Sequence, residues 1–369
     1  MIVGSISVNI NTPDFNYGAI LHSWAFQQYV KKIDFVDYME VIDYTTPYLE
    51  KKHRFFPWID LFKEGKITHA LRAIKRTPAY LARYYKFHRF EKQHMVCSKP
   101  YTQATLSKAQ LPYDVIVCES DIIWNPKLCD GKYDPAFFAA LPCFKKMKKI
   151  AYSPSLGDSM LSKEYAREFK DLLKNLDHIS CRESYAKKII EEHSEKNVTH
   201  VLDPVLLLDP SDYECITAPR ITADKYLLLY LPVNDNEKLR YHAQQYAKQH
   251  HLKILEISTR VRKRPENDIN LVAAGVEEFL SAIKNASCVF TNSFHAICFS
   301  IIFSVEFYAF TRNVPGKVRD ICKTLGLPER FLEDNNFIQQ PPINFAEVHA
   351  KWISMRNESQ SWLLKALST

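Results

Sequence analysis

The residues best suited to chemistry lie in the run from Cys288 to Ala296, with the sequence CVFTNSFHA. Its apolar start predicts a strand that ends at Thr291, and Ser293 is a favoured N-cap for the helix that follows. His295 then falls in the first helical turn, where free N–H groups and the helix dipole favour a phosphate or a carboxylate. A histidine there could exchange a proton with the bound anion, but a capped helix with a packed histidine fits the pattern equally well.

Two cations occupy similar junctions between a predicted strand and a predicted helix. Arg182 could bind a carboxylate or a phosphate with two parallel hydrogen bonds, although an ion pair with Glu183 or another acid is the simpler interpretation of this residue alone. Lys317 lies at the start of its helix, where a cation is unfavourable unless an anion is near, but solvation explains it almost as well. The run Thr259–Arg264 follows another predicted strand and could hold phosphates, with a solvated face slightly favoured.

Three loops in the first half of the chain carry groups that suit a sugar. The loop at 11–18 contains Asn16 but lacks GxGxxG, so a dinucleotide site is not supported. The loop after the strand DVIVC contains Asp121 and Asn125, and a third loop contains Ser155. Together they offer hydroxyl, amide, carboxylate and indole groups, although each loop alone is more often structural.

Apolar strands alternate with amphipathic helices along the chain. Strands are predicted at 2–10, 39–43, 114–118, 148–152, 178–181, 199–202, 226–232, 252–258, 288–291 and 306–310, and helices at 18–31, 162–175, 183–192, 236–250, 276–286, 294–303, 316–325 and 345–367, with a basic helical segment at 58–96. This alternation implies parallel sheets covered by helices on both faces. Pro204, Pro210 and Pro219 mark a linker. The sequence therefore predicts two Rossmann-like domains facing each other across a cleft, with chemistry at the carboxyl ends of the strands.

The composition fits an α/β protein of two domains. The chain has 369 residues, 46% of them hydrophobic, which is enough for two cores. The net charge of +7 suits an anionic substrate, an acidic membrane surface or nucleic acid, but no nucleic-acid module accompanies it. We interpret the denser basic stretches Lys51–Arg54, Arg72–Arg76 and Lys145–Lys149 as solvated faces.

The cysteines and the N-terminus bear on the compartment. Nine cysteines without a CxxC pair predict free thiols in a reducing compartment and argue against a zinc site. The N-terminus lacks a signal-peptide pattern, and no stretch reaches about 18 apolar residues, so no transmembrane helix is predicted. We therefore expect a cytoplasmic protein, one that could still touch the inner face of the membrane.

Taken in order, these segments resemble the polysaccharide pyruvyltransferase family. The matching stretches span residues 9 to about 330 and are Asn16-Tyr17-Gly18-Ala19 up to Gln27, Glu119 to Asn125 (ESDIIWN), Pro154 to Gly157 (PSLG), Arg182-Glu183, Leu202 to Leu208 (LDPVLLL), Thr291 to Ala296 (TNSFHA), and Lys317 ahead of Leu325-Gly326-Leu327. Glu119, Asn292 and Ala296 stand where the family pattern has Gly, Asp and Gly. The change at Asn292 removes a negative charge beside His295, and the departures bear on the acceptor more than on the donor.

The resemblance implies a GT-B-like arrangement of two Rossmann-like domains with an interdomain cleft. It places the acceptor side in residues 1–212, the donor side in 213–344, and a C-terminal helix at 345–369. It implies transfer of pyruvate from phosphoenolpyruvate to two hydroxyls of one sugar, with formation of a ketal and release of phosphate, in the biosynthesis of capsule or another surface polysaccharide. A galactose or hexosamine acceptor fits, and the sequence leaves open whether it is linked to polyprenyl diphosphate. No cofactor, metal ion or nucleic acid is expected.

On the donor side, the resemblance points to four residues. Arg182 and Lys317 would bind the carboxylate and the phosphate of the donor, in an order that the sequence leaves open. Ser293 and His295 would complete the donor site, with His295 as the candidate general acid/base.

On the acceptor side, Asp121 would bind or deprotonate a sugar hydroxyl, and Asn16, Asn125 and Ser155 would complete the binding set. Two alternatives stay open. One is a glycosyltransferase of the same architecture that uses a nucleotide sugar. The other is a non-catalytic glycan-binding protein, which would bind glycan without consuming a donor.

Overall fold

The structure is a computed structural model that describes residues 1–8, 15–52, 57–157, 161, 163–232, 237–258, 268–310, 316–332 and 337–369. The basic run Thr259–Arg264 and the first half of the loop at 11–18 lie outside these ranges. The chain divides into two compact units. Unit 1 comprises Met1–Lys52, Glu91–Leu208 and Ala350–Thr369, and unit 2 comprises His53–Phe90 and Asp209–His349.

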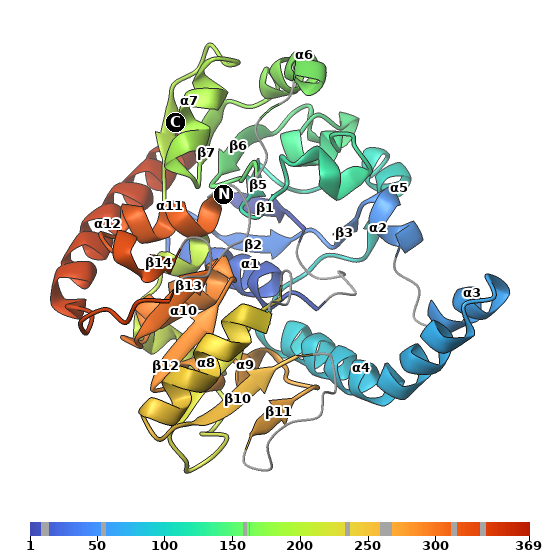
Figure 1. The fold of residues 1–369 in the computed structure, drawn as a ribbon. Coiled ribbons are helices and arrows are strands. Elements are labelled where there is room, and N and C mark those ends of the chain that lie inside the picture. Colours follow the sequence, from blue (N-terminus) through green and yellow to red (C-terminus); the bar gives the residue numbers. More distant parts are fainter. Residues whose placement is uncertain are drawn as a thin grey trace. The chain divides into compact units, whose positions relative to one another are not determined.

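Unit 1 is built around a six-stranded sheet in which all neighbouring strands are parallel (Figure 1). The strand order is β2-β1-β5-β6-β7-β8, and the bounds are β1 Ile2–Ile6, β2 Tyr38–Val41, β5 Val115–Glu119, β6 Lys148–Tyr152, β7 His178–Cys181 and β8 Val198–His200. Consecutive side chains point to opposite faces, so Val117 belongs to one core and Cys118 to the other. The direction of strand order reverses between β1 and β5.

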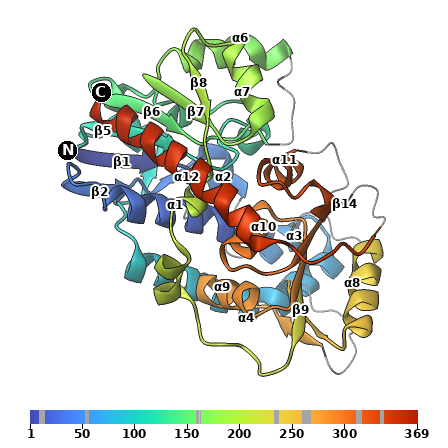
Figure 2. The ribbon, with the colours of Figure 1, turned by 90° about the vertical axis from the view of Figure 1, so that its left-hand side faces the viewer.

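One face of this sheet is covered by α1 (Tyr17–Val30) and by the C-terminal part of α12 (Phe345–Ser368). Phe26 from α1 and Leu363 from α12 are fully buried in one cluster with Val3 of β1. Figure 2 shows α12, in red, running across this side of the strands. Burial of these apolar side chains is what holds both helices on the sheet.

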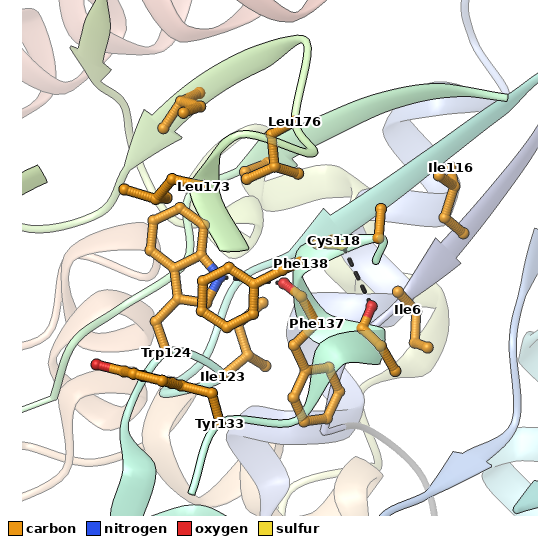
Figure 3. Close-up of a cluster of buried hydrophobic side chains, with 14 of the residues drawn as sticks. Ile6, Ile116, Cys118, Ile123, Trp124, Tyr133, Phe137, Phe138, Leu173 and Leu176 are labelled. Carbon is orange, nitrogen blue, oxygen red and sulfur yellow. Dashed lines mark hydrogen bonds between the residues drawn. The ribbon is translucent and has the colours of Figure 1, made fainter. Parts of the chain in front are cut away.

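The opposite face is covered by α6 (Lys163–Leu173), α7 (Ser184–Glu191) and the loops after β5. Figure 3 shows side chains of this core, among them Cys118 of β5 and Leu173 of α6. Trp124 stacks on Phe138 with ring centroids 5.3 Å apart, and its Nε1 donates a 3.0 Å hydrogen bond to the carbonyl of Phe137. The indole, which at first sight suits a sugar site, is therefore a core side chain with its one donor engaged.

Unit 2 also contains a six-stranded parallel sheet, in the order β11-β10-β9-β12-β13-β14. The strands are β9 Tyr226–Tyr230, β10 Lys253–Ile257, β11 Ile269–Leu271, β12 Cys288–Thr291, β13 Phe307–Phe310 and β14 Phe331–Leu332, and the helices are α8 Glu237–Gln249, α9 Val276–Lys284, α10 Phe294–Ile302 and α11 Lys317–Thr324. Numbered within this sheet, the order is third, second, first, fourth, fifth, sixth, which is that of a Rossmann fold. It reverses between β9 and β12.

The remaining described elements are mostly short. They are β3 (Tyr44–Thr45), β4 (Tyr101–Thr102), α2 (Pro47–Lys52), α3 (Pro57–Lys63), α4 (Ile67–His94), α5 (Gln103–Ser107) and the 3₁₀ turns η1 Pro126–Cys129, η2 Pro135–Phe138, η3 Pro142–Phe144, η4 Pro204–Leu206, η5 Pro210–Ile216 and η6 Pro328–Arg330. The helical segment expected at 58–96 is confirmed and consists of α3 and α4. The strands β3, β4, β11 and β14 were not predicted, because two or three residues are too few to show a period.

The boundaries of the units differ from the predicted domains in two segments. Residues 53–90, expected with the N-terminal half, belong to unit 2. Ion pairs link α4 to α9 there, from Lys86 to Glu278 and from Arg89 to Glu277. The helix therefore packs on partners almost two hundred residues further along the chain.

The second difference concerns α12, of which residues 350–368 belong to unit 1. The indole Nε1 of Trp352 donates a 2.8 Å hydrogen bond to the carbonyl of Leu206, and the amide of Gln360 donates to the carbonyl of Leu207 at 2.9 Å. These contacts satisfy carbonyls in the proline-rich segment where the chain passes from unit 1 to unit 2.

All nine cysteines lie within the described ranges, and none forms a disulfide, as predicted. Among the described residues, no helix combines the length and the apolar character needed to span a bilayer.

Candidate functional site

A buried polar cluster lies at the carboxyl edge of the unit 1 sheet. It gathers nine buried residues from α1 and from four neighbouring strand ends: His22 and Ser23 on α1, Glu119, Ser120 and Asp121 at the end of β5, Ser155 after β6, Arg182 and Glu183 after β7, and Asp203 after β8. We call this set the unit 1 polar cluster. Ligands of open α/β sheets bind outside the carboxyl ends of the strands, near the reversal of strand order, so this cluster is the candidate site of unit 1.

His22 and Glu119 form a fully buried pair at this reversal. Nδ1 of His22 lies 2.8 Å from Oε2 of Glu119, and the hydroxyl of Ser23 donates to Oε1 of the same carboxylate. Burial lowers the pKa of His22, but the surrounding carboxylates, Glu119 first among them, together outweigh burial and leave that pKa above the ordinary 6.5. Burial also raises the pKa of Glu119, against the opposing effect of His22. The pair therefore holds a proton more tightly than two separate side chains would.

Asp121 is the outermost acid of the cluster. Its side chain is 7% exposed, against 1% or less for the other three acids. Oδ2 of Asp121 lies 3.9 Å from Nε2 of His22. A carboxylate in this position could accept a proton from a ligand hydroxyl at the edge of the cluster.

The backbone that carries Asp121 has an unusual conformation. Ser120 and Asp121 have φ angles of 50° and 49°, in a region that residues other than glycine rarely occupy. Hydrogen bonds hold this turn, from the N–H of Ser120 to the carbonyl of Tyr152 at 2.9 Å and from the N–H of Ser155 to the carbonyl of Asp121 at 2.8 Å. Strained backbone of this kind costs stability and persists only where the surrounding structure holds it. It is found most often at functional sites.

Arg182 lies inside the cluster with its side chain 2% exposed. Its Nε donates to Oε1 of Glu183 and its Nη1 to Oδ2 of Asp203, both at 2.9 Å. Asp203 also accepts from the hydroxyl of Ser120 at 2.8 Å and from the N–H of Val205 at 3.1 Å. Burial lowers the pKa of Arg182, but the two carboxylates raise it overall, so the guanidinium stays charged. The ion pair weighed as the simpler alternative is thus present, with Asp203 as a second partner.

Three of the four residues expected to bind the acceptor lie on two adjoining loops. The N–H of Ser155 donates to the carbonyl of Asp121, and the Ser155 hydroxyl donates to a cluster carboxylate at 2.6 Å. The amide of Asn125 lies against Gly157, where an added Cβ would come within 2.6 Å of Nδ2. Gly157 also has a φ of 73°, a backbone conformation that favours glycine. Asn16 is exposed and caps α1, and no described hydrogen bond links it to the other three.

In unit 2, the candidate residues lie where β9 and β12 meet. The hydroxyl of Thr291 donates to the carbonyl of Tyr230 at 2.6 Å and accepts from the N–H of Ser293 at 3.0 Å, which links the ends of the two strands. Ser293 caps α10 by accepting from a backbone N–H of the first turn. His295 is buried in that turn, edge-to-face against Phe294 with ring centroids 5.2 Å apart. The predicted strand, cap and helix are confirmed, and the helix begins at the reversal of strand order.

Lys317 is the first residue of α11 and is half-buried. The strands β12 and β13 are neighbours, so the helices that follow them begin at the same edge of the sheet, and these helices pack against each other. The structure therefore brings Ser293, His295 and Lys317 to one edge of unit 2. Among the described residues, no group of three His, Cys, Asp or Glu side chains has the arrangement of a metal site.

The polar cluster includes residues that the sequence did not assign to a site. His22 and Ser23 lie in a helix that is buried on nearly all sides, so no periodicity marks them. The one available signal was Glu119, because an acid that ends a buried strand requires a partner. Asp203 lay within the matched LDPVLLL segment without a role.

Comparison with protein families decides the assignment. A sequence model of the polysaccharide pyruvyl transferase family matches residues 16–313. The chain belongs to the polysaccharide pyruvyl transferase family. The match includes Asp121, Arg182 and His295, and it confirms the resemblance seen in the motifs. Membership makes the protein a pyruvyltransferase of polysaccharide biosynthesis in general terms. No curated protein is similar enough in sequence to count as a match.

Solved structures show the same architecture. The UDP-GlcNAc 2-epimerase from Methanocaldococcus jannaschii has a TM-score of 0.51 and 12% identity, over 100% of this chain and 99% of that one. The UDP-GlcNAc 2-epimerase from Neisseria meningitidis, bound to UDP-GlcNAc, has a TM-score of 0.50 and 9% identity over the same shares. At this identity the likeness concerns the fold alone. It confirms the predicted α/β class of two Rossmann-like units with a GT-B-like fold.

Proposed function

We propose that this pyruvyltransferase takes pyruvate from phosphoenolpyruvate and joins it to two hydroxyls of one sugar as a ketal. We propose a galactose or hexosamine acceptor, free or carried on polyprenyl diphosphate, and a reaction that takes place in the cytoplasm. Family membership supports the transfer of a pyruvyl group. The observation that most supports the mechanism is the Asp121 carboxylate at the strand reversal of unit 1, beside the His22–Glu119 pair.

The acceptor is assigned to unit 1. A carboxylate such as Asp121 can accept a hydrogen bond from a sugar hydroxyl and take its proton as the oxygen attacks. The imidazole of His22, whose pKa is raised overall by the surrounding carboxylates, lies 3.9 Å from this carboxylate. The loops that carry Asn125 and Ser155 adjoin it, because the N–H of Ser155 donates to the carbonyl of Asp121.

The contacts of Arg182 favour a positioning role over direct binding to the donor. Its Nε and Nη1 both bond to buried carboxylates. Through Glu183 it reaches the hydroxyl of Ser155, and through Asp203 the hydroxyl of Ser120. These two serines belong to the loops that shape the acceptor side. We therefore place the donor anion in unit 2.

The donor is assigned to the first turns of α10 and α11. The positive end of the α10 dipole, capped by Ser293, favours an anionic group, and Lys317 supplies a positive charge at the same sheet edge. His295 is proposed to protonate the methylene carbon of phosphoenolpyruvate. General acid–base catalysis of this kind contributes about 100- to 10,000-fold.

The reaction balances without a further reagent. One hydroxyl oxygen bonds to C2 of the enol, and the methylene carbon gains a proton to become a methyl group. The bond from C2 to the phosphate oxygen breaks, and the second hydroxyl oxygen closes the ketal. The two protons lost from the hydroxyls equal the one gained by the methyl group and the one gained by phosphate.

The experiment is phosphate release from phosphoenolpyruvate with a panel of galactosides and hexosaminides, some linked to lipid diphosphate, with the product mass read in parallel. We expect release that depends on the acceptor and a product heavier by a pyruvate ketal. Asp121→Asn and His295→Gln should slow it by about 100-fold or more. The exposed Asp171→Asn and His250→Gln serve as matched controls and should leave the rate unchanged.

Binding measurements separate the possible failures. Thermal stabilisation by phosphoenolpyruvate without turnover would support the donor assignment and exclude the tested sugars as acceptors. Stabilisation by a nucleotide sugar, with glycosyl transfer, would replace the proposal by a glycosyltransferase. Glycan binding in which no donor is consumed would make the protein a glycan-binding module.

A further inference from the structure

The solvent-facing side of α4 carries an aligned row of apolar side chains. Ile67, Leu71, Ile74, Leu81 and Tyr85 are three, four or seven residues apart, so they lie on one face of the helix. They are 58%, 51%, 40%, 42% and 67% exposed. We call these five residues the α4 stripe. Scattered exposed apolar residues need no explanation, but an aligned row indicates a binding surface.

The α4 stripe is not the face by which the helix packs on unit 2. Phe87 and Phe90 are buried and lie on the other side of the helix. Lys86 forms an ion pair with Glu278, and Gly275 allows a close approach, because an added Cβ there would lie 2.8 Å from Cβ of Lys86. These contacts fix the helix and leave the stripe facing outward.

The segment 57–94, which comprises α3 and α4, carries most of the net charge of the chain. Residues 57–94 contain nine Lys or Arg and three Asp or Glu, a net charge of +6, whereas the whole chain has +7. Lys63, Lys75 and Arg76 are exposed. The ion pairs described for this segment involve Lys66, Lys86 and Arg89 instead. The neighbouring helix α3 (Figure 1) carries two further exposed apolar side chains, Ile59 and Phe62.

An anionic lipid surface matches this pattern better than a second copy of the chain. Two copies that met along their stripes would bring two segments of net charge +6 together, and like charges oppose such pairing. At a bilayer, the apolar side chains enter the headgroup region while the flanking Lys and Arg attract anionic headgroups. Such a bilayer therefore accounts for both the exposed apolar side chains and the positive charge of the segment.

We propose that α3 and α4 form a peripheral membrane-binding surface, which attaches unit 2 to a bilayer that contains anionic lipid. The proposal does not rest on the donor or on the acceptor, because lipid vesicles alone are the ligand. It would bring the enzyme to the surface where lipid-linked sugars reside.

The test is flotation of the full chain with vesicles of phosphatidylcholine alone or mixed with phosphatidylglycerol. We expect binding to the mixed vesicles only, weakened by salt. Leu71→Ser combined with Leu81→Ser should weaken it by about tenfold or more. Lys75→Gln combined with Arg76→Gln should weaken it by about fivefold for each charge removed.

Matched variants elsewhere on the surface serve as controls. Ile338→Ser with Ile353→Ser removes two side chains that are 65% and 44% exposed, and Lys145→Gln with Lys146→Gln removes two exposed charges. Both should bind like the unchanged chain. Equal losses in the control and the test variants, or no binding to mixed vesicles, would overturn the proposal. A lipid-free dimer that dissociates in the Leu71→Ser, Leu81→Ser variant would assign the stripe to a second copy instead. Phosphate release with soluble acceptors should be unaffected throughout.

Discussion

Asp203 offers the sharpest test of the polar cluster, because its carboxylate has several buried partners at once. It accepts hydrogen bonds from Arg182 Nη1 at 2.9 Å, from the Ser120 hydroxyl at 2.8 Å and from the N–H of Val205 at 3.1 Å. Asp203→Ala removes the carboxylate that accepts all three hydrogen bonds. The guanidinium then keeps its charge in a buried position with one ion pair fewer.

The expected loss follows from these contacts. Removing one partner of a buried ion pair destabilises a protein by about 3–5 kcal/mol, mostly through the buried charge that stays behind. Unit 1 comprises about 190 residues, and at that size 1 kcal/mol shifts the melting temperature by about 2–4 °C. The melting temperature of unit 1 should therefore fall by about 6–20 °C.

The assay is thermal unfolding followed by calorimetry and circular dichroism. Asp171→Ala is the control in the same unit, since Asp171 pairs with Lys174 at 2.6 Å but both side chains are more than half exposed. It should cost no more than about 0.5 kcal/mol. Asp203→Asn keeps the shape of the side chain and should fall between the two. Equal melting temperatures for Asp203→Ala and Asp171→Ala would refute the view that the cluster is an interdependent buried network.

Two further predictions concern packing and pH. Gly275→Ala should destabilise unit 2 by about 1–3 kcal/mol, because the new Cβ meets Lys86 Cβ at 2.8 Å, and an unchanged denaturation midpoint would contradict that contact. His22 and Glu119 both have raised pKa values in the folded chain, so their contribution to stability is full at acid pH and is lost as pH rises through those values. The melting temperature should therefore fall above pH 6.5 in the unchanged chain and fall less in the His22→Gln, Glu119→Gln variant, whereas parallel profiles would show that the pair does not bind the proton.

Much of the fold was predictable because its elements are locally encoded. The strand at 288–291, the cap at Ser293 and the helix after it follow from an apolar run, a favoured N-cap and helical spacing. The three-residue strand β11 gives no such signal. Membership of 53–90 in unit 2 depends on contacts distant in sequence, which local patterns cannot show.

The candidate site was predictable in its positions but not in its partners. The sequence placed Asp121 and Arg182 after strands, where chemistry in parallel sheets occurs. It did not show that Arg182 bonds to both Glu183 and Asp203, because pairing across a sheet edge depends on strand order. Nor did it show the left-handed turn at Asp121, since no glycine marks it.

The most direct test of the central claim follows the methylene carbon of the donor. Phosphoenolpyruvate isotopically labelled at that carbon would be incubated with the chain and an active acceptor in deuterated water, and the product examined by NMR and mass spectrometry. The account predicts a labelled methyl group that carries one deuterium from solvent, attached to a ketal carbon that bridges two sugar oxygens. A product that keeps the methylene group as an enol ether, or a sugar that gains a glycosyl group instead, would contradict it.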